Sequence, residues 1–218
     1  MPRIARIVGL GFPHHVVQRG NNKGKIFLDR EDYGKYLSLL GKYSGEKGTP
    51  ILAYCLMSNH VHLLVRPLEE DALAKMMQAV TLCYTQYFNR KKGRTGRLWE
   101  CRYHSTVIDG DRYLWAVSKY IESNPVRIKM VAKPENYPYS SARAHLTGRS
   151  NPLLMEPLGD MKEYKKFMKA EESKSTLEDI RKQTISGKPL GGPGFLEILS
   201  SRLGCSFSFR PRGRPRKK

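Results

Sequence analysis

The sequence predicts an α+β fold: a ferredoxin-like βαββαβα sandwich with an antiparallel sheet, followed by a small C-terminal helical extension and a disordered basic tail. Three observations lead to this prediction. Strand-like and helix-like segments alternate along residues 1–147, and two apolar extended segments are separated by a two-residue turn, as in an antiparallel hairpin. The chain has 218 residues, 39% of them hydrophobic, which suffices for one substantial core. We therefore expect a domain at 1–147, a helical extension at 148–209 and a tail at 210–218.

The first half of the predicted pattern is a strand, a helix and a hairpin. Residues 14–19 form a short strand that ends at the turn-forming residues 20–24. Asp29 can cap a helix over about residues 30–47, where tyrosines and leucines recur at intervals of three and four residues. The hairpin that follows consists of residues 51–57 and 60–66, with Ser58-Asn59 as its turn.

The second half continues with a helix, a strand and another helix. Apolar residues at helical spacing predict a helix over about residues 69–90, followed by a basic, glycine-containing loop at 91–97. Residues 103–108 resemble a strand, and residues 109–111 then open a helix that Pro125 ends. The helical extension is predicted from two further segments, 176–184 and 194–204.

Net charge is the clearest indication of the partners of this chain. Lys and Arg total 39 against 20 Asp and Glu, and the resulting charge of +19 attracts polyanions. No apolar run approaches the roughly 20 residues of a membrane span, and no sustained apolar stretch near the N-terminus indicates a secretory signal. The four cysteines stand far apart without a CxxC pair, which favours reduced thiols. We expect a cytoplasmic, nucleoid-associated protein without a membrane partner.

Two histidines in the second hairpin strand form the first candidate site. His60 and His62 point to the same face of a strand because side chains alternate, while Val61 enters the core on the other face. Two imidazoles about 7 Å apart along a strand can converge on one cation. The alternative is a pair of surface histidines on a solvated sheet face.

A tyrosine-bearing helix supplies the second candidate site. Tyr120 and Asn124 are one helical turn apart, so a phenol and an amide oxygen would lie side by side. An amide oxygen is an acceptable ligand for Mg²⁺ or Mn²⁺. Pro125 disfavours the α conformation for Asn124, which would place it in the last turn of the helix. The alternative is that Tyr120 is a core residue with a satisfied hydroxyl group.

These motifs together resemble a known family. Residues 57–62 (MSNHVH) and 120–126 (YIESNPV) are similar to the two signature motifs of the REP-associated tyrosine transposases, which belong to the HUH superfamily of single-tyrosine transposases. Residues 15–21 (HVVQRGN) resemble the first strand and turn of that family, and residues 97–103 (RLWECRY) resemble the segment before its fourth strand. The resemblance covers about residues 3–147 and keeps the four motifs in the expected order.

The resemblance implies a ferredoxin-like fold, a divalent cation (Mg²⁺ or Mn²⁺) and cleavage of single-stranded DNA beside folded hairpins. It matches His60 and His62 to the metal ligands and Asn124 to the residue that completes the metal site. It matches Tyr120 to the nucleophile, which would form a 5′-phosphotyrosine and free a 3′-hydroxyl group. Tyr113, two turns earlier on nearly the same helical face, is the second candidate nucleophile.

Several basic and polar residues are candidates for holding DNA. Trp99 could stack on unpaired bases, although the alternative is that it anchors a solvated basic loop in the core. The tail contains an Arg-Gly-Arg-Pro core that resembles an AT-hook, with Arg212 and Arg214 as the minor-groove candidates. The extension at 148–209 is expected to grip structured DNA. The other candidates are Arg19, Asn21, Asn22, Lys91, Lys92, Arg94, Arg97 and Arg102.

The leading interpretation is a metal-dependent DNA strand-transferase, and two alternatives remain. One is a non-catalytic single-stranded nucleic-acid-binding or regulatory protein on the same fold, because net charge does not separate a binder from an enzyme. The other is a structural zinc site that combines Cys55 or Cys101 with His60, His62 or His104, whose spacing matches no zinc-finger pattern. The sequence leaves open whether the protein is a monomer or a homodimer.

Overall fold

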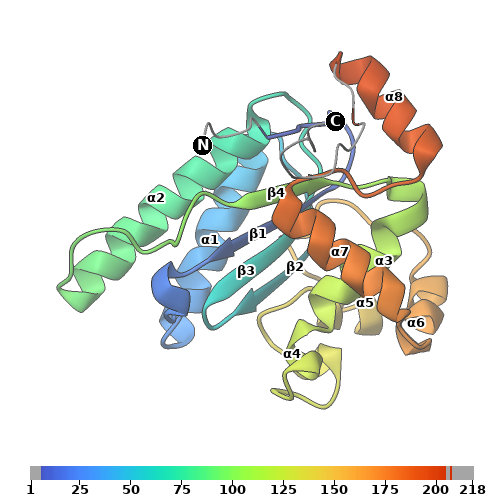
Figure 1. Cartoon of the computed structure of the whole chain (residues 1–218). Helices are drawn as coiled ribbons and strands as arrows, with labels where there is room; N and C mark the ends of the chain where they lie inside the picture. The colour runs from blue at the N-terminus through green and yellow to red at the C-terminus, as the bar shows by residue number, and fades with distance from the viewer. Residues whose placement is uncertain (1–5, 205–206, 208–218) are drawn as a thin grey trace, which may run out of the picture.

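The computed structural model describes residues 6–204 and 207, and its centre is a four-stranded antiparallel sheet with the strand order β2-β3-β1-β4 (Figure 1). This order places the hairpin and the first and last strands as the sequence predicts for a ferredoxin-like fold, so the predicted fold class is confirmed. The strands are β1 (His14–Arg19), β2 (Ile51–Met57), β3 (His60–Val65) and β4 (His104–Val107).

Helices cover both faces of this sheet. Two of them differ at their ends from the prediction, because α2 continues to the left-handed Gly93 and a short helix resumes directly after α3. Among the described residues, no helix combines the length and the apolar composition that crossing a lipid bilayer requires. The helices are α1 (Arg30–Glu46), α2 (Ala72–Lys92), α3 (Gly110–Glu122), α4 (Asn124–Arg127), α5 (Ala142–Thr147), α6 (Met161–Lys169), α7 (Lys174–Ser186) and α8 (Pro193–Leu203), with 3-10 turns at Asn21–Lys23 and Pro134–Asn136.

Strand β3 contributes to both faces of the sheet. Its Val61, Leu63 and Val65 side chains are fully buried in the cluster formed with α1 and α2. Leu64 lies in the cluster on the opposite face, under α3. His60 and His62 share the side of Leu64 because side chains of a strand alternate. The predicted orientation of the hairpin strand is therefore confirmed.

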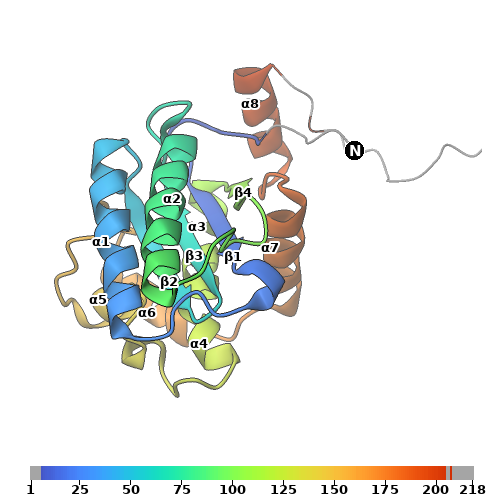
Figure 2. The same cartoon turned by 90° about the vertical axis from the view of Figure 1, so that its left-hand side faces the viewer.

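Aromatic side chains fill the face that α1 and α2 cover, and the two helices lie side by side over it in Figure 2. Tyr36 and Tyr84 are fully buried, with ring centroids 5.2 Å apart and an interplanar angle of 83°. Edge-to-face pairs of this kind add about 1 kcal/mol beyond the burial of their area. Trp99 joins the same cluster and donates a hydrogen bond from Nε1 to Thr85 Oγ1 at 3.0 Å.

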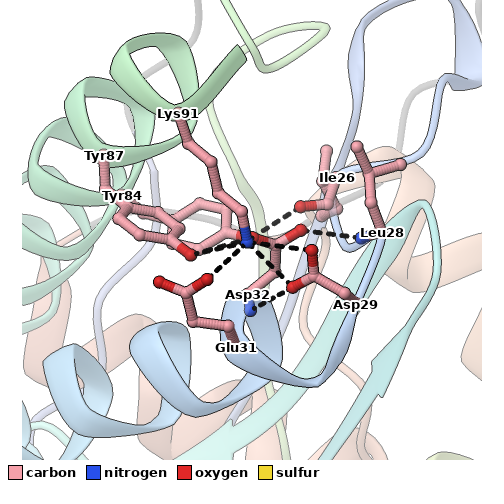
Figure 3. Close-up of polar contacts among 8 residues, drawn as sticks. All are labelled: Ile26, Leu28, Asp29, Glu31, Asp32, Tyr84, Tyr87 and Lys91. Carbon is pink, nitrogen blue, oxygen red and sulfur yellow. Dashed lines mark hydrogen bonds and ion pairs between the residues drawn. The ribbon is translucent and has the colours of Figure 1, made fainter.

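An ion cluster joins the ends of α1 and α2 (Figure 3). The Asp32 carboxylate is fully buried and accepts hydrogen bonds from Leu28 N, Tyr87 Oη and Lys91 Nζ at 2.8, 3.0 and 2.8 Å. Lys91 Nζ also lies 2.9 Å from Asp29 and from Glu31. Burial alone would lower the pKa of the Lys91 ammonium, but its hydrogen bonds to these carboxylates raise that pKa above the usual value. Lys91 therefore stays charged and fixes the two helix ends to each other.

The opposite face of the sheet lies under α3, α6 and α7 (Figure 1). Ile121 of α3, Tyr164 of α6 and Ile180 of α7 are buried in one cluster with residues of β2. The segment 148–209, expected as an extension, thus shares a hydrophobic core with the sheet over its described residues. Its helix α8 packs separately, through Phe195 and Leu199 against Val107.

Segments outside the strands border both edge strands. Along β2, Leu56 N donates to Tyr139 O at 2.9 Å and Ser141 N donates to Tyr54 O at 3.0 Å. Beside the end of β4, Leu190 N donates to Val107 O at 2.8 Å. Part of the hydrogen-bonding capacity of each edge is therefore used within the chain.

Candidate active site around Tyr120

The histidines of β3 face two residues of β1 on the side of the sheet that carries α3. In the antiparallel register, His60 is opposite Arg19 and His62 is opposite Val17. His15, two positions before Val17, lies on the same face as His62 by strand alternation. Three imidazoles and one guanidinium thus gather on this face.

The imidazole rings are close to one another and have defined partners. The ring centroids of His60 and His62 are 5.0 Å apart. His60 Nδ1 lies 2.7 Å from Asn59 Oδ1, and His62 Nδ1 lies 3.0 Å from His15 Nε2. Burial lowers the pKa of His60 to about 4, with a further contribution from the Arg19 charge, and lowers the pKa of His15 to about 3. Burial first, and then the neighbouring imidazoles, also lower the pKa of His62 well below its ordinary value. Neutral rings keep nitrogen lone pairs, which a cation requires.

Helix α3 carries Tyr120 to the histidines. The half-buried Tyr120 ring lies 5.8 Å from the His62 ring and 5.8 Å from the His15 ring between centroids, edge-on to both. The guanidinium carbon of Arg127 lies 4.6 Å from the centroid of the same Tyr120 ring. Tyr113, two turns earlier, instead lines a cavity of about 310 Å³ between α3 and α7. Of the two candidate nucleophiles, the fold brings Tyr120 to the histidines.

The backbone after Tyr120 turns in a way that orients Asn124. Helix α3 ends at Glu122, and Asn124 begins α4 instead of lying in the last turn of α3 as the sequence predicted. Ser123 keeps helical angles (φ −86°, ψ 0°) between the two helices. Asn124 Nδ2 donates to Tyr120 O at 2.8 Å and to Ile121 O at 3.3 Å. Both bonds are donated by the amide NH2 group, so neither of them occupies the amide oxygen of Asn124.

Glu122, for which the sequence indicated no role, fixes this end of α3. Its fully buried carboxylate accepts hydrogen bonds from Ser141 Oγ and His145 Nδ1 at 2.5 Å each and from Tyr164 Oη at 3.0 Å. These partners come from α5, α6 and the residue before α5. Moving a buried carboxylate away from its hydrogen-bond partners costs free energy. Glu122 therefore restrains the turn that follows Tyr120.

Arg127 is a second residue that sequence reasoning missed. Its Nη1 donates to Tyr120 O at 2.6 Å, and its Nη2 lies 2.6 Å from Glu172 Oε1. Glu172 belongs to the loop between α6 and α7. The only signal in the sequence was the position of Arg127 one turn beyond Asn124, which would place it beside the candidate site.

The donor set can be compared with the needs of a divalent cation. Among the residues that the structure describes, no three His, Cys, Asp or Glu side chains are grouped so that they could hold a metal ion. A cation at His60 and His62 would therefore also use the amide oxygen of Asn124 and oxygen atoms of substrate or solvent. The available lone pairs fit such a cation. The zinc alternative has no support within the described residues, since neither Cys55 nor Cys101 joins a group of three such side chains.

Most of the predicted DNA-contacting residues lie on the surface, but Trp99 is buried and Lys91 is paired with carboxylates. Trp99 is only 8% exposed and packs in the aromatic cluster, so its prediction as a base-stacking platform is wrong and the core-anchor alternative holds. Lys91 ends α2 and is paired with three carboxylates, so its charge is already engaged within the chain, and its role as a phosphate contact stays a prediction. Besides Lys91, the exposed or half-exposed candidates are Arg19, Asn21, Asn22, Lys92, Arg94, Arg97 and Arg102.

Two of these candidates belong to a turn that packs beside the site. Gly20 N donates to Asn59 O at 2.8 Å, and Asn21 N donates to Leu98 O at 2.9 Å. A Cβ atom at Gly20 would lie 2.3 Å from Gly24 O, so only glycine allows this approach. The turn therefore holds Asn21 and Asn22 near the start of β3. Arg212 and Arg214 of the AT-hook-like tail lie outside the described residues.

Comparison with known proteins identifies the family. The family described as "Transposase IS200 like" matches residues 11–124, just over half of the 218 residues. A Haemophilus influenzae (strain ATCC 51907 / DSM 11121 / KW20 / Rd) protein, whose name assigns it to the REP-associated tyrosine transposases, is 29% identical over 100 residues. That alignment covers 41% of this chain and 57% of the relative, so the chain spans little more than half of the relative's length.

A similar fold occurs in a solved structure, described as a REP-associated tyrosine transposase bound to a REP hairpin. The similarity covers 73% of this chain and 94% of that one, with a TM-score of 0.57 and 17% sequence identity. At this identity the likeness establishes the fold. The match over residues 11–124 shows the family, and the order of the motifs and the observed topology agree with it. The chain therefore belongs to the IS200-like transposase family.

Proposed function

We propose that this protein cleaves and rejoins single-stranded DNA beside hairpins, with Tyr120 as the nucleophile and Mg²⁺ or Mn²⁺ held by His60, His62 and Asn124. The observation that carries the proposal is the position of the Tyr120 ring, edge-on to His62 with 5.8 Å between the centroids. A purely structural tyrosine has no need of neighbouring neutral imidazoles with available lone pairs. DNA strand cleavage is also the activity that membership of a transposase family implies.

The chemical step uses atoms of Tyr120 and the DNA. Tyr120 Oη attacks the phosphorus atom of a phosphodiester, so that a new O–P bond forms and the bond to the 3′ oxygen breaks. The phenolic proton passes to solvent water, and the departing 3′ oxygen takes up a proton from solvent to become a hydroxyl group. The product is a 5′-phosphotyrosine. Because this ester retains the energy of the original phosphodiester, a 3′-hydroxyl group of another strand can reverse the step and join the ends.

Two groups beside Tyr120 suit the negative charge of this reaction. A bound divalent cation would polarise the scissile phosphate and neutralise developing charge. The Arg127 guanidinium, 4.6 Å from the centre of the Tyr120 ring, adds a fixed positive charge at the same place. Glu172 and the Tyr120 carbonyl group hold this guanidinium in position.

The proposed substrate follows from charge and from exposed side chains near the site. The net charge of +19 supports binding of a polyanion, and Arg19 lies opposite His60 in the sheet register. Arg94, Arg97 and Arg102 add exposed positive charge in the connection before β4. The similar fold of the transposase solved with a REP hairpin supports hairpin DNA as the substrate class to test first.

The proposal is tested with a labelled hairpin oligonucleotide that carries a single-stranded flank, incubated with the full chain and Mn²⁺ or Mg²⁺. We expect a covalent protein–DNA adduct on a denaturing gel, and its loss in Tyr120→Phe. Tyr113→Phe is the matched control, because it removes the second phenol of the same helix and should retain the adduct. An adduct that persists in Tyr120→Phe would contradict the assignment of the nucleophile.

The alternative of a non-catalytic binder predicts a different result in the same experiment. A protein that shifts the hairpin on a native gel but forms no adduct, across varied flanking sequences and with either cation, would support it. Such a binder should also bind equally well with and without the cation.

A further inference from the structure

A buried chain of three side chains connects α7 to the candidate metal site. Thr184 Oγ1 of α7 lies 2.9 Å from His15 Nδ1 of β1, and His15 Nε2 lies 3.0 Å from His62 Nδ1 of β3. The three residues are 8%, 1% and 5% exposed. His15 is thus enclosed between a hydroxyl group of the C-terminal part of the chain and a candidate metal ligand.

The direction of these hydrogen bonds follows from the hydroxyl group of Thr184, the first of the three side chains. Its Oγ1 lies 2.7 Å from Ile180 O, one turn earlier in α7, and this carbonyl oxygen can only accept. The hydroxyl proton therefore points to Ile180, and the hydroxyl oxygen accepts from His15 Nδ1–H. A neutral imidazole carries one proton, so His15 Nε2 is an acceptor. The facing His62 Nδ1 must then carry a proton and donate it.

The same reasoning leaves a defined lone pair on His62. A neutral His62 ring with its proton on Nδ1 has its free lone pair on Nε2. The His15 and His62 rings are inclined by only 15°, with centroids 5.2 Å apart, which suits a hydrogen bond between ring edges. Fixing the tautomer in this way is what partners of metal-binding histidines do in other proteins.

We infer that His15 and Thr184 are positioning residues that hold His62 in the Nδ1-protonated tautomer and keep its Nε2 free for a divalent cation. The cation part of this inference rests on the proposed function; the tautomer part does not. Thr184 lies beyond residues 11–124, the part that matches the family. The C-terminal helices thereby contribute to the site, in addition to covering the sheet.

The other candidate ligand, His60, is fixed by a different and local arrangement. Asn59 Nδ2 donates to Lys23 O at 3.0 Å, so Asn59 Oδ1 is the atom that accepts from His60 Nδ1 at 2.7 Å. His60 therefore also has its free lone pair on Nε2. Because this partner does not involve α7, His60 provides an internal reference for changes made at Thr184.

The test uses Thr184→Val in the full chain, with Thr184→Ser as the matched control. Valine has nearly the shape of threonine but cannot accept a hydrogen bond, whereas serine keeps the hydroxyl group. Histidine tautomers are read from long-range ¹H–¹⁵N correlation spectra without metal. We expect His62 protonated on Nδ1 in wild type and in Thr184→Ser, and a shift of its proton toward Nε2 in Thr184→Val, with His60 unchanged.

Mn²⁺ titration followed by electron paramagnetic resonance gives the second measurement. Thr184→Val should weaken Mn²⁺ binding about 10–100-fold, the usual effect of losing such a partner, and Thr184→Ser should restore it. Urea unfolding checks that the two variants have similar stability. His62 protonated on Nε2 in wild type, or unchanged tautomer and Mn²⁺ affinity in Thr184→Val, would overturn the inference.

These measurements separate the inference from the proposed cleavage reaction. A wild-type protein that shows the expected tautomer and binds Mn²⁺, but cleaves no hairpin, would refute the function and leave the positioning roles supported. If the wild-type protein cleaves DNA, but Thr184→Val changes neither the His62 tautomer nor the Mn²⁺ affinity, the function is supported and the positioning roles are refuted. Absence of Mn²⁺ binding by wild type would overturn the cation part of the inference.

Discussion

On the face of the sheet that α1 and α2 cover, strands and helices meet through apolar and aromatic side chains, with the Asp32–Lys91 ion cluster at one end. On the face that α3 and α7 cover, the same strands present His15, His60 and His62 among polar partners. The first face holds the larger cluster of buried apolar residues, whose burial stabilises the domain. The second face gives up part of that burial for groups suited to chemistry. Successive residues of one strand serve these two purposes.

Neighbouring residues of β3 allow the sharpest test of this division. Leu63→Ala should lower the free energy of unfolding by about 2–5 kcal/mol, because Leu63 is fully buried in the aromatic face. His62→Gln should reduce adduct formation at least about 100-fold, since it removes a ligand of the proposed cation, which would supply several kcal/mol of charge stabilisation. Urea unfolding should show the larger change in Leu63→Ala, and the adduct gel should show the larger change in His62→Gln. Equal loss of adduct in folded Leu63→Ala would break the comparison.

The ion cluster predicts that charge also stabilises the aromatic face. Asp32→Asn should lower the free energy of unfolding by about 3 kcal/mol, because it removes the charge of the buried carboxylate. That carboxylate accepts hydrogen bonds from Leu28 N, Tyr87 Oη and Lys91 Nζ. Folded Asp32→Asn should form the DNA adduct at the wild-type rate. The measurements are urea unfolding and the adduct gel at low temperature. A variant as stable as wild type would show that the cluster is energetically neutral.

Buried histidine also predicts how stability depends on pH, and His14 allows a test outside the candidate site. Burial lowers its pKa to about 4, although its hydrogen bond to Phe12 O opposes that shift. Between pH about 6.5 and 4 the unfolded chain binds a proton that the folded chain does not, so stability is complete above this window and falls as pH decreases through it.

His14 is expected to contribute about 3 kcal/mol to the decrease in unfolding free energy between these pH values. His14→Gln should therefore have a shallower decline in unfolding free energy between pH 6.5 and 4 than wild type. The measurement is a series of urea unfolding curves across this window. Parallel declines in the two proteins would contradict a depressed pKa at His14.

The smallest expected effect separates two adjacent lysines. Lys92→Gln should weaken hairpin binding a few-fold and reduce the salt dependence of the binding constant by about one charge, because Lys92 is exposed. Lys91→Gln should leave the salt dependence unchanged and lower stability instead, because its ammonium is already paired. Filter binding at several salt concentrations measures the slopes. Equal slopes for the two variants would contradict the assignment.

Local sequence patterns predicted the parts of the molecule that depend on periodicity. Alternation placed His60 and His62 on one face, and helical spacing placed Tyr120 and Asn124 one turn apart; the structure agrees with the first and modifies the second through the break at Ser123. The contacts that complete the site join residues distant in sequence. His15 and Thr184 are separated by 169 positions, and no periodicity indicates that they meet.

The environments of Trp99 and Lys91, which the sequence did not predict, have a related cause. Both residues lie in a basic stretch whose composition indicates a solvated loop. The aromatic cluster takes in the Trp99 ring, and three carboxylates at the start of α1 bind Lys91. The composition of such a stretch predicts only its average environment. Tertiary contacts decide which individual side chains are buried or paired.

The segments that border the sheet have a consequence for self-association. A bare strand edge can recruit a strand from another molecule, which is a common route to aggregation. Here Tyr139 and Ser141 occupy part of the outer side of β2, and Leu190 occupies the end of the four-residue strand β4. Shortening the chain before Thr184 would remove Leu190, which covers the end of β4, together with the α7 hydroxyl group that contacts His15. Truncated forms should therefore be prone to precipitate, as well as being altered at the candidate site.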